Sequence, residues 1–566
     1  MLRTGSGPRL AAALAAGVLA IGLRPAPLGA QIDTLRYLFH YEPVGIGGPR
    51  LAVDVEFRGE RSGVTRVVEP SRWAGEDSLW RSIERLEPAP GAAIVSRGDG
   101  SFLIRHLPGA PVRIHYVLRQ DWTGPLRYPV MHRPVLDDAR ILFNQSNGLV
   151  FPSRSLGDSI VLQYRWTGLP SNWRILTSFG AKADYTGLVS LREFAGASFA
   201  AGDFRLVAAP GGPGGVTIEA QGAWRFADAD LARTVQSLWG AETRFWGGAA
   251  FDHAFVLLLP IANGATLAGD AFTAGFVAAA DSTTELDGLG RLLAHELFHL
   301  WNGQRLAAIE TEARFKWFTE GVTDYYADRI FRQLGRYADS TYRGRVNAVF
   351  RNYYSSPARG DSRADVAARF WIDQSVKRYP YVQGYALALY LQANLPRWAG
   401  VPFDLDSLMV GLFRGAHGRS IEITDSLVAG GAPGPARDSV AAAIRRYVDE
   451  GQMIPADPDA LGRCVAVETQ PVYAFDLGFN GPASMRDRVI RGVQAGGPAA
   501  RAGVPEGASL LGYRWDSSDP TAPVLLQVDD GHGPRVIRYL PRGVQMFLAP
   551  QYVPTPQAPG CLTIRP

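Results

Sequence analysis

The sequence has few cysteines, a low share of charged residues and no long uninterrupted apolar segment. Two cysteines among 566 residues exclude a disulfide-rich scaffold. Charged residues make up 20% of the chain, and the net charge of +4 is not gathered into basic runs, so nucleic acid is not an expected partner. No segment reaches the roughly 18 consecutive apolar residues typical of a transmembrane helix.

Motifs for hydrolysis through a covalent intermediate are also missing, since the chain has neither a serine-hydrolase elbow nor a cysteine triad. What the chain does have is apolar material: 46% hydrophobic and 11% aromatic residues are enough for several hydrophobic cores. The length allows roughly three or four domains. We therefore expect a large, ordered protein.

The most informative stretch is His-Glu-Leu-Phe-His at residues 295–299. Histidines four residues apart lie on one face of a helix, so His295 and His299 are predicted to bind the same metal ion. Glu296 is placed to act as the general base toward a metal-bound water. Apolar residues at helical spacing surround the motif, with Asp287 as the predicted N-cap and Gly303 as the predicted end of the helix.

A second segment, Trp-Phe-Thr-Glu-Gly at residues 317–321, supplies a third ligand. A catalytic zinc ion commonly takes two histidines and a glutamate and keeps one position open. Glu320, in a second predicted helix, is the expected ligand, and we expect one zinc ion per chain. Glu310 and Glu312 compete for this role. They lie closer to the first helix in the sequence, so few residues remain for the chain to turn back toward the histidines.

Asp324 follows Glu320 by four residues, hence on the same helical face. Its carboxylate is predicted to accept the second ring N–H of a ligating histidine, most naturally His295, and so to fix the tautomer. The alternative is an ordinary surface carboxylate.

These motifs resemble those of the glycyl aminopeptidase family of zinc metallopeptidases, in the glutamate-zincin group. The matching segments are HELFHLWN at 295–302, WFTEGVTDYY at 317–326, YVQG at 381–384 and YVDEGQMIP at 447–455. The resemblance implies an α+β multidomain protein. Its parts would be an N-terminal β-sandwich domain (31–192), a thermolysin-like, mainly helical catalytic domain (193–458) and a C-terminal PDZ-like β domain (459–566).

The Tyr381-x-x-Gly384 pattern resembles the place where enzymes of the aminopeptidase N type keep a tyrosine that stabilises the transition state. The resemblance therefore makes Tyr381 the candidate donor to the oxyanion. Other tyrosines compete for this role, namely Tyr379, Tyr385, Tyr325 and Tyr326.

The chain departs from the family at the segment expected to bind the substrate's amino group. Where the family has a Gly-Gly-Leu-Glu-His-like segment, this chain has residues 267–275, with Asp270 as the only acid. Peptide hydrolysis by an aminopeptidase is the preferred prediction, with Asp270 facing the substrate amine. The alternatives are a zinc endopeptidase and a catalytically idle protein that binds peptides.

The first 30 residues are typical of a signal peptide, with Arg3 and Arg9 before a short alanine-rich apolar run. The mature protein is expected to be periplasmic or secreted, without a stable membrane span; an uncleaved N-terminal anchor is the alternative. In an oxidising compartment Cys464 and Cys561 are expected to form a disulfide, and two separate thiols are the alternative.

The remaining predictions concern strands and histidines. Short strands with turn residues between them are expected at 36–40, 51–57, 93–95, 101–105, 112–118, 159–164 and 173–178, a sandwich pattern, and a buried strand at 255–260. Further strands are expected at 489–493, 524–528 and 536–540, in the PDZ-like region, which would take an extended peptide or serve only for packing. His40, His106, His115 and His132 are expected to pack or face solvent.

Overall fold

The computed structural model describes residues 33–43, 48–98, 100–153, 158–212, 214–262, 267–307, 313–462, 464–515 and 520–555. The predicted signal peptide and Cys561 lie outside these residues, so export stays a prediction. Cys464 is disulfide-bonded, as predicted. None of the helices in the described ranges is long and apolar enough to cross a membrane.

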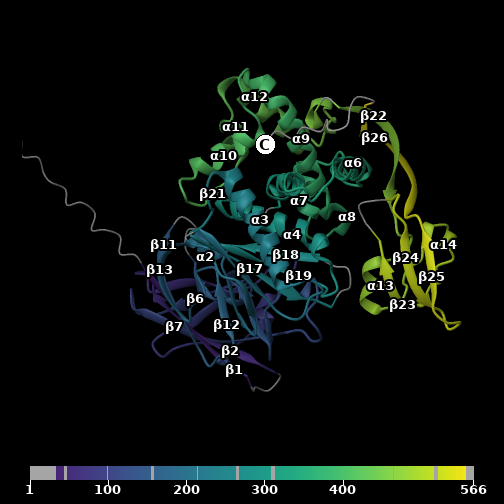
Figure 1. The fold of residues 1–566 in the computed structure, drawn as a ribbon. Coiled ribbons are helices and arrows are strands. Elements are labelled where there is room, and N and C mark those ends of the chain that lie inside the picture. Colours follow the sequence, from purple (N-terminus) through teal and green to yellow (C-terminus); the bar gives the residue numbers. More distant parts are fainter. Residues whose placement is uncertain are drawn as a thin grey trace, which may run out of the picture.

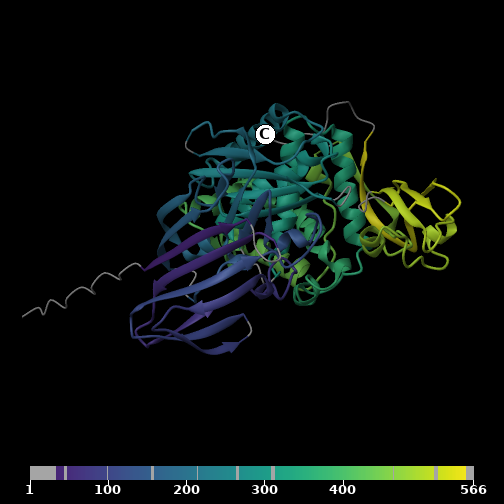
Figure 2. The same ribbon diagram turned by 90° about the horizontal axis from the view of Figure 1, so that it is seen from below.

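The N-terminal part is built from β-sheets (Figures 1 and 2). One six-stranded sheet contains, in spatial order, β13 (Asp184–Ser190), β11 (Ser159–Thr167), β1 (Thr34–Glu42), β2 (Arg50–Arg58), β7 (Pro111–Arg119) and β4 (Ile83–Pro88). A four-stranded sheet contains β10 (Phe151–Pro152), β3 (Val64–Val68), β6 (Ser101–Arg105) and β5 (Ala93–Gly98). The seven strands predicted between residues 36 and 178 are confirmed, while β3, β4, β10 and β13 of these two sheets were not predicted.

A central sheet is buried on both of its faces and joins two cores. It contains β12 (Arg174–Thr177), β14 (Ser198–Gly202), β9 (Arg140–Asn144) and β8 (Val135–Asp137). Successive side chains of a strand point to opposite faces. Ile141 and Phe143 of β9 therefore pack against the six-stranded sheet, and Leu142 between them packs on the other side.

On that other side lies a mixed five-stranded sheet. Its strands are β15 (Arg205–Ala208), β16 (Gly215–Ala220), β17 (His253–Pro260), β19 (Gly275–Ala280) and β18 (Leu267–Phe272). The predicted buried strand is confirmed as β17: Phe255 and Leu257 face the central sheet, whereas Val256 and Leu258 face the helices. A strand buried on both faces has no polar side, which explains its continuous apolar sequence.

Helices cover the second face of this sheet and form the middle of the chain. They are α3 (Asp228–Trp246), α4 (Leu286–Phe298), α5 (Thr323–Gln333), α6 (Asp339–Ser355), α7 (Arg363–Arg369), α8 (Gln374–Lys377), α9 (Tyr379–Ala399), α10 (Leu405–Gly415), α11 (Asp425–Gly430) and α12 (Gly434–Ile444). The π-helical turns are η3 (Leu300–Arg305), η5 (Trp317–Val322) and η6 (Arg445–Asp449). Shorter elements are η1 (Leu79–Ser82), η2 (Val130–His132), α1 (Gln145–Gly148), α2 (Leu191–Ala195), η7 (Pro458–Leu461), β20 (Leu306–Ala307) and β21 (Ile421–Glu422).

The C-terminal β region stands to one side of the helices (Figure 1). A long ribbon of β22 (Val465–Phe475) and β26 (Arg542–Pro554) connects it to α6, where Tyr552 N–H donates to the Asn347 side chain at 2.7 Å. Its own core lies around β23 (Ser509–Arg514), β24 (Val524–Asp529) and β25 (Arg535–Tyr539), with α13 (Gly481–Asp487) and α14 (Pro498–Arg501).

The predicted α+β chain with N-terminal sheets, a helical middle and a C-terminal β region is confirmed, and its domain boundaries stay predictions. Strands β24 and β25 lie where they were expected. The strand predicted at 489–493 is wrong, because only Val489 makes a bridge, to Ser509. Gly492, at φ 67°, bends the backbone away from strand geometry there.

Candidate metal centre

Helix α4 carries the His-Glu-x-x-His motif on a buried face. Leu289, Leu293 and Leu297 anchor the helix in the core, because they recur at helical spacing and are fully buried. Two predictions about its ends are wrong. The N-cap is Glu285 and Asp287 lies inside the first turn, while the α-helix ends at Phe298, before Gly303.

His295, His299 and Glu320 converge as predicted, and they are the group in the described part of the chain that could hold a metal ion. The two Nε2 atoms lie 2.9 Å apart, and each lies 3.3 Å from Glu320 Oε2. In a tetrahedral site with zinc bonds of about 2.1 Å, neighbouring ligand atoms are about 3.4 Å apart. The three atoms therefore fit a zinc ion.

Each histidine is held in the tautomer that metal binding needs. His295 Nδ1–H donates to Asp324 at 2.9 Å, and His299 Nδ1–H donates to the Asn302 carbonyl at 3.0 Å. Both Nε2 lone pairs are then directed at the position of the metal. The π-helical turn η3 makes the second contact possible, because Asn302 and Gly303 leave helical geometry there.

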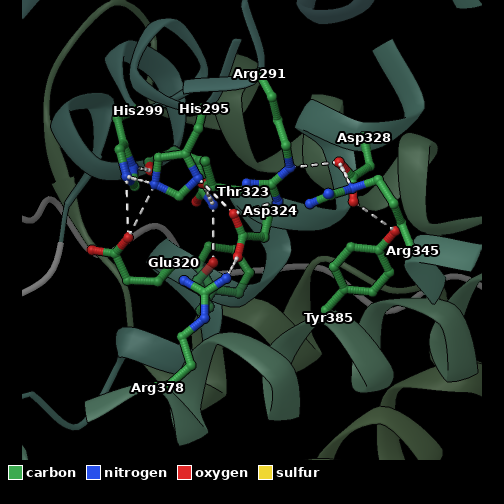
Figure 3. A network of polar contacts seen from close by, with 12 residues as sticks. Arg291, His295, His299, Glu320, Thr323, Asp324, Asp328, Arg345, Arg378 and Tyr385 are labelled. Carbon is green, nitrogen blue, oxygen red and sulfur yellow. Dashed lines mark hydrogen bonds and ion pairs between the residues drawn. The ribbon is translucent and has the colours of Figure 1, made fainter. Parts of the chain in front are cut away.

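Asp324 is itself fixed by positive charge (Figure 3). Arg291 donates to Asp324 at 2.8 Å and to Asp328 at 2.6 Å, and Arg378 lies 3.7 Å from Asp324. Burial opposes ionisation of Asp324, but Arg291 and His295 outweigh it and hold the pKa of Asp324 below its ordinary value. The carboxylate stays charged behind His295 and is buried, not an ordinary surface group.

Glu320 lies in η5, which leads directly into α5. Lys316, one turn earlier, donates to its second oxygen at 3.0 Å. Burial opposes ionisation, yet Lys316 and the two histidines hold the pKa of Glu320 well below its ordinary value. The competing ligands Glu310 and Glu312 lie outside the described residues.

Glu296 faces the cavity beside the two histidines and is buried. Burial raises its pKa to about 7, although His295 and His299 oppose the rise. Strand β18 passes close by, and a Cβ added at Gly269 would lie 2.4 Å from Glu296 Oε1. Only glycine at this position leaves the carboxylate its space.

Tyr381 lines the same cavity, whereas the competing tyrosines at 325, 326, 379 and 385 do not. Its ring stacks on His295 with centroids 6.4 Å apart, and the Arg378 guanidinium lies 5.0 Å from the ring. Gly384, one turn later, lies against η5, because a Cβ there would be 1.8 Å from the Trp317 carbonyl oxygen. The Tyr-x-x-Gly pattern thus brings Tyr381 to the metal ligands by letting α9 and η5 touch.

The cavity around this site has a volume of about 480 Å³ and reaches from the helices to the N-terminal sheets. Asp270 lies on its β18 side, half-buried, with His132 Nε2 at 3.3 Å from its carboxylate. The prediction that His132 packs is confirmed, because the ring is buried between Trp73 and Tyr128, and it also lines the cavity.

Other cavity residues were not predicted at all. They are Trp73, Tyr128, Phe370, Trp371 and Lys377 among the side chains around Asp270 and Tyr381. They come from segments that are far apart in the sequence and belong to no motif, so no pattern in the chain indicates that they meet.

A metal group of two histidines and a glutamate, with a buried glutamate facing the same cavity, defines a zinc metallopeptidase of the aminopeptidase class. Within that class, residues 289–394 match the model of the M61 glycyl aminopeptidase family.

Solved structures support the fold. A protein of the aminopeptidase N family from Idiomarina loihiensis is 14% identical, with a TM-score of 0.63, over 91% of this chain and 97% of its own. A two-domain M1 zinc metallopeptidase variant bound to L-arginine is 15% identical, with a TM-score of 0.50, over 76% of this chain and 97% of its own. No curated protein matches the sequence.

Proposed function

We propose that the protein is an exported aminopeptidase that removes residues from the free N-termini of peptides, with one zinc ion per chain. The observation that carries this proposal is one cavity that contains the metal ligands, a buried glutamate and a separate acid, Asp270. A bound zinc ion would activate a water molecule and polarise the scissile carbonyl.

Glu296 is the general base in this proposal. Its carboxylate lies among the metal ligands and faces the cavity, so it takes a proton from the attacking water and returns it to the departing amine. A pKa raised to about 7 by burial suits both steps, because the group gains and loses a proton near neutral pH.

Tyr381 is the second donor to the developing oxyanion. Its hydroxyl has no hydrogen-bond partner among the described residues, and its ring is held parallel to His295. A donor kept in place before the reaction stabilises the transition state without a reorganisation cost.

Asp270 is the partner for the substrate's amino group. An ammonium in a partly desolvated cavity needs a carboxylate, because an unpaired buried charge is costly. Asp270 is the acid of strand β18, and it lines the cavity on the side formed by the sheet. If Asp270 does not bind the amine, the same metal site serves an endopeptidase, which is the second candidate function.

The finer parts of the architecture belong to the same proposal. We propose a β-sandwich at 31–192, a thermolysin-like catalytic domain at 193–458 and a PDZ-like domain at 459–566 that takes peptide ligands, behind a signal peptide. Gly497 to Val504 supports the PDZ-like assignment, since α14 and the turn at Gly503 lie there.

The direct test is metal content paired with hydrolysis. The purified protein should contain one zinc ion per chain, and a chelator should abolish peptide hydrolysis until zinc is restored. The variant Glu320→Ala should lose the zinc ion. The control variant Asp287→Ala, which removes an exposed acid, should keep it. Full zinc occupancy in Glu320→Ala would refute the ligand assignment.

A further inference from the structure

Lysine is rare in this chain and is concentrated at the cavity. Among the 58 basic residues of the full sequence, lysine occurs only at positions 182, 316 and 377. Lys316 and Lys377 both line the cavity, and Lys182 is exposed elsewhere. The two cavity lysines have different surroundings, because Lys316 is paired with Glu320 at 3.0 Å.

Lys377 has no ion pair with any acid in the described residues. Its Nζ donates to Tyr128 Oη at 3.1 Å and lies 5.8 Å from the centroids of both the Tyr128 ring and the Trp371 ring. The aromatic rings hold the ammonium in place by cation–π contact but leave its charge uncompensated. A half-buried ammonium in a cavity is therefore available to an anion.

The same aromatic residue connects Lys377 to the proposed amine site. The Tyr128 ring packs edge-on against His132 with centroids 5.2 Å apart, and His132 Nε2 lies 3.3 Å from Asp270. Trp73 packs edge-on against His132 at 5.3 Å. One wall of the cavity thus carries an acid at one end and an unpaired cation at the other. A short peptide carries the complementary charges at its two ends.

We propose that Lys377 binds a carboxylate of the peptide substrate on the leaving-group side of the scissile bond. This inference rests on the proposed peptidase function and names its substrate class, peptides with a carboxylate close to the cleaved bond. Two sources supply that group: the C-terminus of a di- or tripeptide, or the side chain of an aspartate or glutamate.

The test compares Lys377→Met with Lys182→Met, a matched loss of an exposed lysine. The substrates are trialanine, its C-terminal amide, and the amide of alanyl-glutamyl-alanine. Loss of a charge-assisted hydrogen bond should raise KM by about tenfold or more. Lys377→Met should show this rise for trialanine if the terminal carboxylate binds, and for the glutamyl amide if the side chain binds. For the C-terminal amide of trialanine, the KM of Lys377→Met should stay within about twofold of the wild-type value.

A rise in KM for all three substrates would overturn the proposal, since it would mark a structural role. An unchanged KM for all three would overturn it as well. A wild-type protein that hydrolyses none of the substrates refutes the proposed function separately.

A second readout does not need turnover. Glu296→Gln protein, loaded with zinc, is incubated with trialanine or its amide and then reductively methylated with formaldehyde. The modified lysines are distinguished by peptide mass mapping, which three lysines make simple. Trialanine should slow methylation of Lys377 by at least threefold more than the amide does, and Lys182 should react equally in both. Equal protection of Lys377 by both peptides would exclude the terminal carboxylate as the bound group. If the amide of alanyl-glutamyl-alanine then protected Lys377 no better than the trialanine amide, the proposal would be overturned.

Discussion

The metal group and the wall opposite it differ in how their polar atoms are satisfied. Around the metal position, His295 and His299 each have a partner for Nδ1, and Lys316 donates to Glu320. Asp324, the partner of His295, is itself held by Arg291. Along the wall formed by Trp73, Tyr128, His132, Asp270 and Lys377, charges lie alone or in loose pairs, such as Asp270 with His132 at 3.3 Å.

This difference separates two tasks. A metal ion needs ligands that do not move, because affinity and geometry depend on supporting hydrogen bonds. A peptide brings its own charges, so the groups that receive it must be left with unused hydrogen-bonding capacity. We therefore expect substitutions in the metal group to change turnover or metal affinity, and substitutions in the wall to change the choice of substrate.

The largest expected effect separates metal binding from chemistry within the metal group. Glu296→Gln keeps the size and shape of the side chain that packs against Gly269, but it removes the general base. The value of kcat should fall by roughly 10²–10⁴, with one zinc ion retained per chain. The measurement is steady-state kinetics with metal analysis of the same sample, and loss of zinc would show that Glu296 supports the ligands instead.

The next effect concerns Tyr381, whose ring stacks on His295 and lines the cavity. Tyr381→Phe should lower kcat by roughly 10²–10³ with little change in KM, because an oxyanion donor acts only in the transition state. Tyr379→Phe is the matched control, since that ring stacks on Tyr353 and does not line the cavity. A fall in kcat of less than about threefold would mean that the Tyr381 ring only packs against His295.

A smaller effect is expected at Asp324, which accepts a hydrogen bond from the metal ligand His295. Asp324→Asn weakens the acceptor of His295 Nδ1–H, so zinc affinity should fall by roughly 10- to 100-fold. Competition with a chelator of known affinity measures this directly. Unchanged zinc affinity would show that the rigid surroundings, not the Asp324 charge, orient His295.

The metal group was predictable from the sequence because its parts are local. The spacing of two histidines fixes their common face on α4, and Glu320 and Asp324 share a face for the same reason. What the spacing does not contain is the π-helical geometry of η3 and η5, which arises where Gly303 leaves helical geometry and where Gly384 meets the Trp317 carbonyl. The predicted end of α4 at Gly303 is wrong for this reason.

The wall was not predictable because its residues meet only through tertiary packing. His132 and Tyr128 belong to the segment around η2, Asp270 to β18, and Lys377 to the end of α8. None of these segments has a repeated spacing that would indicate a site. Strands were easier to predict where their sequence shows burial. Strands β2 and β17 have clear apolar patterns, whereas β4, whose side chains are partly exposed, was not predicted.

The measurement that tests the account most directly is the ratio of hydrolysis rates for a peptide with a free N-terminus and the same peptide N-acetylated. If Asp270 binds the substrate amine, the wild-type protein should cleave the free peptide at least about tenfold faster, and Asp270→Asn should remove most of that preference. The exposed Asp287→Asn control should keep it. Equal rates for the free and blocked peptides would contradict an aminopeptidase and leave an endopeptidase at the same zinc site.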